Sequence, residues 1–248
     1  MRIPRIYQAI PLASGQTLEL DAQATVYLAK VLRLRVGDEL RVFNGGGGEF
    51  AAQVSELGRR AARITLGEAV PGLPESPLEL RLLQGVSRGE RMDYTVQKAV
   101  ELGVNRIVPV LAERTTVNLK GERRDRRRAH WQGVVHSACE QSGRNRVPAV
   151  APVTPFAEAI AGAEGLKLVL HHRAPSDLAS LSAPAGPVTL LIGPEGGLSA
   201  GEIDAAEAAG FVPLRLGPRV LRTETAALAA LAVLQWQWGD FNSGMGES

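Results

Sequence analysis

The sequence predicts an α/β protein in which a small β-rich domain precedes a larger domain built on a parallel sheet. Short strands joined by tight turns fill residues 1–70, and this pattern favours a small barrel. Residues 71–77 contain three prolines and are expected to be a linker. From residue 78 to residue 248, apolar strands alternate with helical patterns, as in parallel sheets that helices cover on both faces.

The elements expected in residues 1–70 are short. We expect strands at residues 17–20, 36–43, 50–54 and 61–66, and a helical segment at residues 22–34. The run from Asn44 to Gly48 contains four glycines and is interpreted as the flexible tip of a hairpin. A phosphate-binding loop is the alternative, but neither a lysine nor a helix start follows these glycines.

The elements expected in residues 78–248 are longer and more apolar. Met92, Val96, Ala99, Val100 and Gly103 recur at helical spacing and share one face. The complete set of expected elements comprises strands at residues 78–84, 107–111, 166–170, 188–192 and 214–216 and helices at residues 92–103, 123–141 and 223–238.

Composition and charge narrow the class of protein. With 45% hydrophobic and 22% charged residues, the 248-residue chain has the composition of a globular protein. Its net charge is +2, but the local balance is +2 over residues 1–72, +5 over residues 73–150 and −5 over residues 151–248. The basic residues are mostly arginine, which suits nucleic acid, although a genomic preference for arginine is an equal alternative. Since no apolar run reaches about 18 residues, we expect a cytoplasmic protein without a membrane span.

A glycine-rich turn at residues 193–197 is the strongest local signal for a ligand. It follows the apolar strand expected at residues 188–192, and Ser199 with Glu202 forms a capping box that opens a helix after it. Ligands of open α/β sheets bind beyond the carboxyl ends of strands, where this turn lies. A plain strand-to-helix turn is the alternative. The turn matches neither a P-loop nor a dinucleotide motif, so nucleotide phosphates are not the implied ligand.

A second turn of the same kind lies about twenty residues later. Gly217 follows a short strand, and Thr223 is expected to cap the last helix. Arg219 and Arg222 lie next to the start of this helix, where positive charge opposes the helix dipole. We therefore expect at least one of these arginines to bind a ligand.

The histidines and the single cysteine carry weaker signals. His130, His136 and the pair His171–His172 have no neighbouring residues that would complete a metal site, so we expect no metal. Cys139 lies on a predicted helix with apolar neighbours and is expected to be a packing residue. One cysteine cannot form an internal disulfide.

Seven sequence motifs are recognisable along the chain: Arg5 and residues 30–33, 36–38, 97–104, 140–144, 193–197 and 216–226. Together they resemble the RsmE family of SPOUT-class methyltransferases, which methylate N-3 of a uridine in 16S ribosomal RNA. The family often has a polar residue just before the motif at residues 30–33, where this chain has Tyr-Leu-Ala at residues 27–29.

The resemblance implies a fold, a cofactor and an oligomeric state. Residues 1–70 are expected to form a PUA-like RNA-binding barrel, and residues 78–248 a SPOUT domain with a carboxyl-terminal trefoil knot. S-adenosylmethionine would bind in the knot without a metal. Two copies are expected to pair through their knots, and the face formed by Ala226, Ala227, Ala229 and Ala230 would permit this, although a core role explains it equally well. The implied cofactor-binding residues are Leu170, His171, His172, Ile192, Gly193, Pro194, Glu195, Gly196, Gly197, Leu216, Gly217, Val220, Leu221 and Thr225.

The resemblance also suggests which residues act on the RNA. Methylation of uracil N-3 requires loss of its proton, so an arginine should stabilise the anion and a carboxylate should accept the proton. Arg222 with Glu224, or Glu195, are the candidates. The small ribosomal subunit is the expected partner. A SPOUT enzyme acting on ribose or transfer RNA and a non-enzymatic assembly factor remain alternatives. The expected RNA-binding residues are Arg2, Arg5, Lys30, Arg33, Arg88, Arg91 and Arg144.

Overall fold

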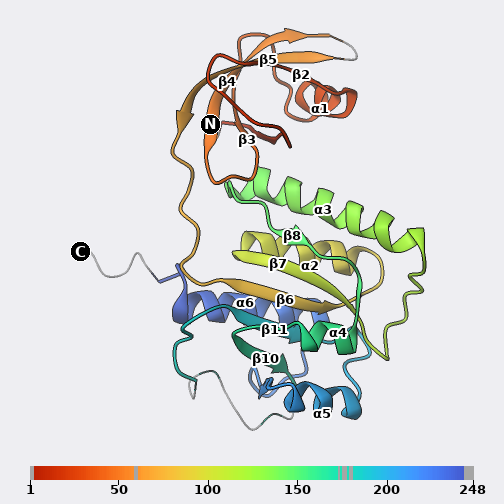
Figure 1. The fold of residues 1–248 in the computed structure, drawn as a ribbon. Coiled ribbons are helices and arrows are strands. Elements are labelled where there is room, and N and C mark those ends of the chain that lie inside the picture. Colours follow the sequence, from red (N-terminus) through yellow and green to blue (C-terminus); the bar gives the residue numbers. More distant parts are fainter. Residues whose placement is uncertain (1–2, 59–60, 173, 175–177, 179–180, 243–248) are drawn as a thin grey trace. The chain divides into compact units, whose positions relative to one another are not determined.

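The computed structural model describes residues 3–58, 61–172, 174, 178 and 181–242 (Figure 1). The chain divides into two compact units. The first contains Met1–Glu75 and also Cys139–Val147, and the second contains Ser76–Ala138 and Pro148–Ser248. The first unit is therefore made from two separate stretches of the sequence.

A five-stranded sheet forms the first unit. Its strand order is β1-β3-β4-β5-β2, and all neighbours are antiparallel except β1 and β3. Alternate residues point inward, as Leu18 and Leu20 do in β2, and these side chains form the core of the unit. The strands are β1 (Arg5–Tyr7), β2 (Thr17–Leu20), β3 (Glu39–Phe43), β4 (Glu49–Leu57) and β5 (Ala62–Val70).

The strand expected at residues 36–43 begins only at Glu39, and two other expectations for the first unit are wrong. The helical segment begins as α1 (Ala22–Val26), capped by Asp21, but continues as a π-helical turn over Tyr27–Val31 instead of an α-helix to residue 34. The glycine run is not a free hairpin tip, because Gly45 and Gly46 each pair with Arg146. The segment at residues 139–147 therefore lies against the glycines.

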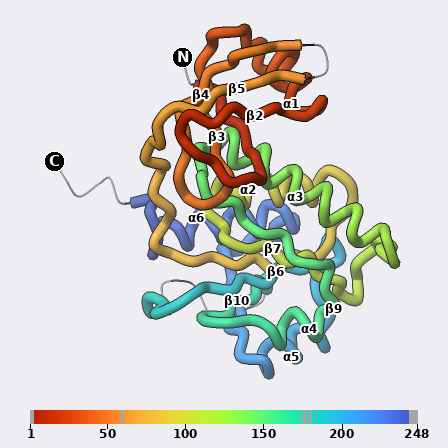
Figure 2. The backbone as a smooth tube through the Cα atoms, turned by 45° about the horizontal axis from the view of Figure 1, so that its top comes forward, coloured from red at the N-terminus to blue at the C-terminus, as the bar shows by residue number. Residues whose placement is uncertain are grey.

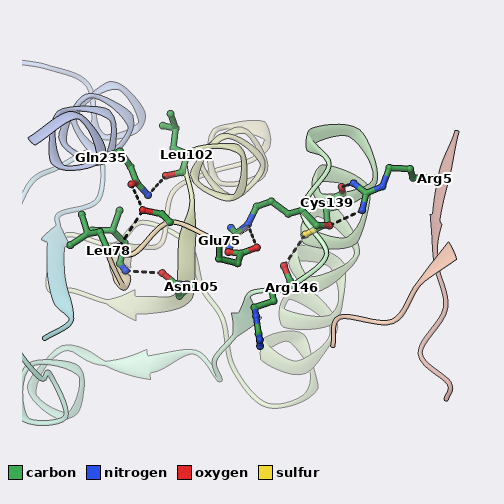
Figure 3. Close-up of polar contacts among 11 residues, drawn as sticks. Arg5, Glu75, Leu78, Leu102, Asn105, Cys139, Arg146 and Gln235 are labelled. Atoms are coloured by element: carbon green, nitrogen blue, oxygen red, sulfur yellow. Dashed lines mark hydrogen bonds and ion pairs between the residues drawn. The ribbon is translucent and has the colours of Figure 1, made fainter. Parts of the chain in front are cut away.

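Arg5 connects the two stretches of the first unit (Figure 3). Its side chain is buried, with the guanidinium 4.7 Å from the centre of the Phe43 ring and paired with Glu49 at 3.1 Å. It also donates hydrogen bonds to the carbonyl of Cys139 at 3.1 Å and to the side chain of Asn145. Arg5 thus satisfies acceptors that the polypeptide buries far apart in sequence.

A seven-stranded parallel sheet forms the centre of the second unit. Its order is β12-β10-β11-β6-β7-β8, with β9 paired to β7. The strands are β6 (Leu80–Gly85), β7 (Val104–Leu111), β8 (Ala149–Val150), β9 (Thr154–Pro155), β10 (Leu166–Leu170), β11 (Val188–Ile192) and β12 (Val212–Leu214). The helices are α2 (Glu90–Glu101), α3 (Glu122–Ser142), α4 (Phe156–Ala161), α5 (Ala200–Ala208) and α6 (Thr223–Trp238).

Helices cover both faces of this sheet (Figures 1 and 2). Leu83 in β6 packs in a cluster with Ile160 of α4 and Ile203 of α5, which lie together. The next residue, Gln84, donates a hydrogen bond to Thr223 at the start of α6. Because successive residues of a strand point to opposite faces, α6 covers the face opposite to α4 and α5. None of the helices in the described ranges is long and apolar enough to cross a bilayer.

The longer elements expected for the second unit are present, but several bounds differ. Strand β6 begins at Leu80 and not at residue 78, and β7 begins at Val104 and not at residue 107. Helix α2 spans Glu90–Glu101 and not residues 92–103. The expected bounds of β10, β11 and α6 match those observed. The strand expected at residues 214–216 is wrong by two residues, since β12 ends at Leu214. The short elements β8, β9 and α4 were not predicted.

Candidate functional site

The three turns that carry the candidate residues meet at one edge of the parallel sheet. Strand β10 lies between β11 and β12, and both pairings are parallel. Carboxyl ends of adjacent parallel strands lie at the same edge, so residues 171–172, 193–197 and 215–222 come together there. They surround a pocket of about 510 Å³, within the usual range of roughly 300–1,000 Å³ for ligand sites.

Nearly every residue predicted to bind the cofactor lines this pocket. The exception is Thr225, which is exposed on α6 and does not belong to the lining. Arg222, Glu224 and Glu195, the candidate catalytic residues, also line it. The lining residues that match the prediction are Leu170, His171, His172, Ile192, Gly193, Pro194, Glu195, Gly196, Gly197, Leu216, Gly217, Val220 and Leu221. Their binding of a cofactor stays a prediction.

Thr223 was predicted to cap α6, but it instead hydrogen bonds to the turn at residues 193–197. Arg222 occupies the N-cap position without a side-chain capping bond. The Thr223 hydroxyl instead donates to the carbonyl of Gly193 at 2.6 Å and accepts from Gln84 Nε2 at 2.9 Å. Gly85 lets the turn approach β6, because a β-carbon there would lie 2.3 Å from the Pro194 nitrogen. The turn is thereby held against the end of β6.

Arg114, which follows β7, is a site residue that was not predicted from the sequence. Its Nη1 donates to the carbonyl of Gly196 at 3.1 Å, and its side chain lines the pocket. A β-carbon on Gly196 would lie 2.9 Å from the β-carbon of Arg114, so this glycine makes room for the arginine. The only sequence signal was a charged residue just after an expected strand.

Glu202 joins the same segment to α5. Its buried carboxylate accepts from the backbone of Ser199 at 2.9 Å, which confirms the predicted capping box. The other oxygen accepts from the backbone of Glu113 at 2.8 Å. The capping carboxylate therefore also fixes the residues that precede Arg114.

Glu195 is already engaged at the edge of the pocket. Its carboxylate accepts from the backbone of Arg88 at 2.8 Å and pairs with Arg91 at 3.4 Å. Burial raises its pKa, but these hydrogen bonds and the charge of Arg91 outweigh burial, so the pKa of Glu195 lies below its ordinary value. Glu195 is thus a held, ionised carboxylate. Arg91, which was expected to bind RNA, lines the pocket.

Arg222 and Glu224, unlike Glu195, line the pocket with polar groups that have no partner among the described residues. The guanidinium of Arg222 is exposed, and within the described residues no hydrogen bond holds it. Glu224 Oε2 is buried and has no hydrogen-bond partner in the described part of the chain. A buried carboxylate oxygen without a partner is costly, and in a pocket it is an acceptor for a ligand.

The expected RNA-binding residues divide into exposed and buried ones. Lys30 and Arg33 are exposed, and Arg33 has a positive φ of 56°. Arg5 is buried, and Arg144 is 11% exposed and paired with Glu75, so both hold the first unit together and neither offers its guanidinium to RNA. Arg2 lies outside the described residues.

The cysteine and histidines behave largely as structural residues. Cys139 is fully buried, as predicted for a packing residue, and burial raises the pKa of its thiol to about 11. His130 hydrogen bonds Asp93 at 2.8 Å, and burial lowers the pKa of His136. The described residues contain no group of three or more side chains suited to a metal ion.

Known proteins resemble both parts of the chain. A family model for an RNA methyltransferase domain matches residues 74–235, and one for the RNA methyltransferase PUA domain matches residues 20–67. Ribosomal RNA small subunit methyltransferase E of Buchnera aphidicola (subsp. Schizaphis graminum) is 36% identical over 244 residues, which are 97% of this chain and 99% of that protein.

Solved structures extend this similarity to the fold. The ribosomal RNA small subunit methyltransferase E of Neisseria gonorrhoeae, bound to S-adenosyl methionine, has a TM-score of 0.90 at 40% identity, covering 97% of this chain and 100% of that one. A putative methyltransferase of Legionella pneumophila in complex with the same cofactor has a TM-score of 0.94 at 39% identity, with the same coverage. The family that the sequence motifs indicated is confirmed: the chain belongs to the RNA methyltransferases that include the ribosomal RNA small subunit methyltransferases E.

Proposed function

We propose that this protein transfers the methyl group of S-adenosylmethionine to N-3 of a uridine in the 16S RNA of the small ribosomal subunit. The observation that carries the proposal is the pocket at the ends of β10, β11 and β12. It lies in a chain that aligns over 97% of its length with a ribosomal RNA methyltransferase bound to S-adenosyl methionine.

The residues of the pocket fit this cofactor. Apolar side chains such as Leu170, Ile192 and Leu216 offer a surface for the adenine ring, and the turns at residues 193–197 and 215–222 offer backbone groups. The free oxygen of Glu224 suits a cationic or hydrogen-donating part of the ligand. When bound, S-adenosylmethionine supplies a methyl group that is already activated for transfer. The trefoil knot implied by the family remains a prediction.

The chain's own residues must position the uracil and manage its N-3 proton. Uracil N-3 is protonated at neutral pH, so its lone pair becomes available only as the proton leaves. We assign Arg222 to stabilise the developing anion, because its exposed guanidinium lines the pocket without another partner among the residues the structure describes. Glu224 is preferred to Glu195 as the proton acceptor, since Arg88 and Arg91 already occupy Glu195.

Variants of Arg222 test this assignment. Arg222→Lys keeps the charge but loses the planar fork, whereas Arg222→Ala loses both, so turnover should fall in both and further in the alanine variant. Binding of S-adenosylhomocysteine by calorimetry and the melting temperature should change little. Arg219→Ala, in the same exposed turn, is the matched control with a smaller expected effect. Normal turnover of Arg222→Ala would move the role to Arg219.

The substrate is tested by mapping the modified nucleotide. Small subunits that lack the methylation should gain one methyl group on a uracil base when incubated with the enzyme and cofactor. Methylation of a ribose hydroxyl, or of transfer RNA only, would contradict the proposed reaction. Absence of both methylation and S-adenosylhomocysteine binding would favour a non-enzymatic assembly factor. Because ribosomal RNA is the substrate, we place the enzyme in the cytoplasm.

We propose that the active form is a homodimer that pairs through α6. Ala227 and Ala230 are buried in the core, which accounts for half of the predicted alanine face. Ala229, Val233 and Trp236 recur at helical spacing on another face, and Val233 and Trp236 are 41% and 50% exposed. An exposed apolar face on α6 needs a partner to cover it. Trp236→Glu should shift the protein from dimer to monomer in analytical ultracentrifugation.

Lys30 and Arg33 are the remaining candidates for RNA contacts in the first unit. Both are exposed: Lys30 lies in the π-helical turn at Tyr27–Val31, and Arg33 follows it. Replacing both with glutamine should weaken binding to small subunits without changing the affinity for S-adenosylhomocysteine. Unchanged affinity for the subunits would remove these residues from the RNA contact.

A further inference from the structure

Three arginines and a histidine lie on a single face of α3, away from the pocket described above. Arg123, Arg126, Arg127 and His130 have the spacing i, i+3, i+4 and i+7, which places them on one face of a helix. We call this set the arginine face. All four side chains are exposed, and they line a hollow of about 430 Å³ together with Val117, Asn118 and Leu119.

The charge of the arginine face is largely uncompensated. Arg126 pairs with Glu122 at 3.6 Å, but these side chains are 74% and 91% exposed, so water screens the pair. His130 hydrogen bonds Asp93. Arg123 and Arg127 have no side-chain hydrogen bond or ion pair with any residue that the structure describes.

Two other arginines of the same helix provide a contrast. Arg124 Nε donates to the carbonyl of Leu119 at 3.0 Å, and Arg128 Nε donates to the carbonyl of Val150 at 2.9 Å. These two also lie four residues apart. Arg124 and Arg128 therefore hydrogen bond α3 to neighbouring backbone, whereas Arg123 and Arg127 on the arginine face make no such contact with the described residues.

The arrangement on the arginine face is unfavourable for the helix itself. Arg123 and Arg127 are like charges at i, i+4, and Arg123 lies in the first turn, where positive charge opposes the helix dipole. A genomic preference for arginine over lysine accounts for the residue type but not for this placement. An external anion that lies in the hollow would offset both effects.

We infer that the arginine face binds phosphates of the ribosomal RNA substrate outside the target nucleotide. The inference rests on the proposed function, since RNA is chosen over an acidic peptide because the enzyme modifies ribosomal RNA. A guanidinium presents paired donors that match two phosphate oxygens, and the polar residue Asn118 lines the same hollow. These contacts position the RNA and carry no sequence information.

The salt dependence of binding tests the inference. Each phosphate contact contributes roughly 0.7–0.9 to the slope of log affinity against log salt. The double variant Arg123→Gln/Arg127→Gln should lower this slope by about 1.4–1.8 and weaken binding to small ribosomal subunits about tenfold near 0.1 M salt. Its melting temperature and its affinity for S-adenosylhomocysteine should match those of the wild type.

The contrasting pair on α3 is the matched control. Arg124→Gln/Arg128→Gln removes the same charge from the same helix but also two hydrogen bonds to backbone carbonyls. It should lower the melting temperature and leave the salt slope unchanged. If both double variants lower the slope equally, net charge and not the arginine face explains the binding, and the inference is overturned.

Two further outcomes separate the inference from the function on which it rests. Methylation of the same subunits by the wild-type enzyme is measured in parallel. If methylation fails, the proposed function is wrong, but the comparison of slopes still decides whether the arginine face binds RNA. If methylation proceeds and Arg123→Gln/Arg127→Gln retains the wild-type slope, the arginine face is not a phosphate site.

Discussion

Replacing Thr223 with valine should loosen the turn at residues 193–197 without changing the shape of the side chain. The hydroxyl donates to the carbonyl of Gly193 at 2.6 Å and accepts from Gln84 at 2.9 Å, and Thr223 is 8% exposed. Gln84 Nε2 keeps its contact with the carbonyl of Gly85 at 3.1 Å, whereas the Gly193 carbonyl loses this donor. Two lost bonds at about 0.5–1.5 kcal/mol each give a destabilisation of about 1–3 kcal/mol.

This destabilisation is large enough to measure. At about 2–4 °C per kcal/mol for a chain of this size, the melting temperature of Thr223→Val should fall by about 2–12 °C. If the free turn must be ordered again when a ligand binds, the affinity for S-adenosylhomocysteine should fall roughly tenfold, because fixing one residue costs about 1–2 kcal/mol. Differential scanning fluorimetry and calorimetry measure the two effects.

Thr225→Val is the matched control for this experiment. Thr225 lies on the same turn of α6, but it is exposed and does not line the pocket. Its replacement should leave the melting temperature within about 1 °C of the wild type, as is usual for surface substitutions. If Thr223→Val melts like the wild type and binds S-adenosylhomocysteine equally well, Thr223 does not hold the turn and the reasoning fails.

Three further predictions concern burial and close packing. Burial raises the pKa of Cys139 to about 11, so at pH 8 roughly a thousandth of the thiol is ionised. Ellman's reagent should therefore react rapidly with this thiol only after the protein unfolds. Fast labelling of the native protein would contradict this prediction. Burial raises the pKa of Glu140 above its unfolded value, so ionisation of this carboxyl as the pH rises favours unfolding. The melting temperature of Glu140→Gln should therefore rise relative to that of the wild type between pH 4 and pH 7. Melting temperatures that change in parallel with pH would refute this prediction. Gly85→Ala would place a β-carbon 2.3 Å from Pro194 and should lower the free energy of unfolding by about 1–3 kcal/mol. Gly133→Ala is the control, because a β-carbon there meets no atom within 4 Å, and it should be neutral or stabilising by about 0.5–1 kcal/mol. Equal effects of the two substitutions would show that the turn at Pro194 moves away from the β-carbon at little cost.

The sequence predicted the elements that have strong internal patterns. The mostly apolar runs of β10 and β11, each with one polar residue, and the capping box of Ser199 and Glu202 depend on neighbouring residues, and both are found as expected. The two-residue strands β8 and β9 are too short to show any periodicity. Strand β12 contains Pro213 and lies at the sheet edge, so its bounds had no alternation to mark them.

The site could be predicted only as far as its glycine-rich turns. These turns follow directly from strand ends, whereas Arg114 contacts Gly196 across 82 residues of sequence. Arg5 was predicted as a site residue but has a structural role. An arginine near the start of a basic segment indicates a surface contact with RNA, whereas in the structure its side chain is buried against Glu49 and the carbonyl of Cys139. Long-range polar contacts of this kind leave no local pattern in the sequence.

The discontinuous first unit sets an order of events during synthesis. Residues 1–75 leave the ribosome first, but their partners at residues 139–147 follow only after another 63 residues have been translated. Until then, the Arg5 guanidinium lacks the acceptors of Cys139 and Asn145, and Glu75 lacks Arg144. A gene fragment that ends at residue 75 would therefore encode an incomplete fold, and the amino-terminal unit of this enzyme must wait for the end of α3 before it can close.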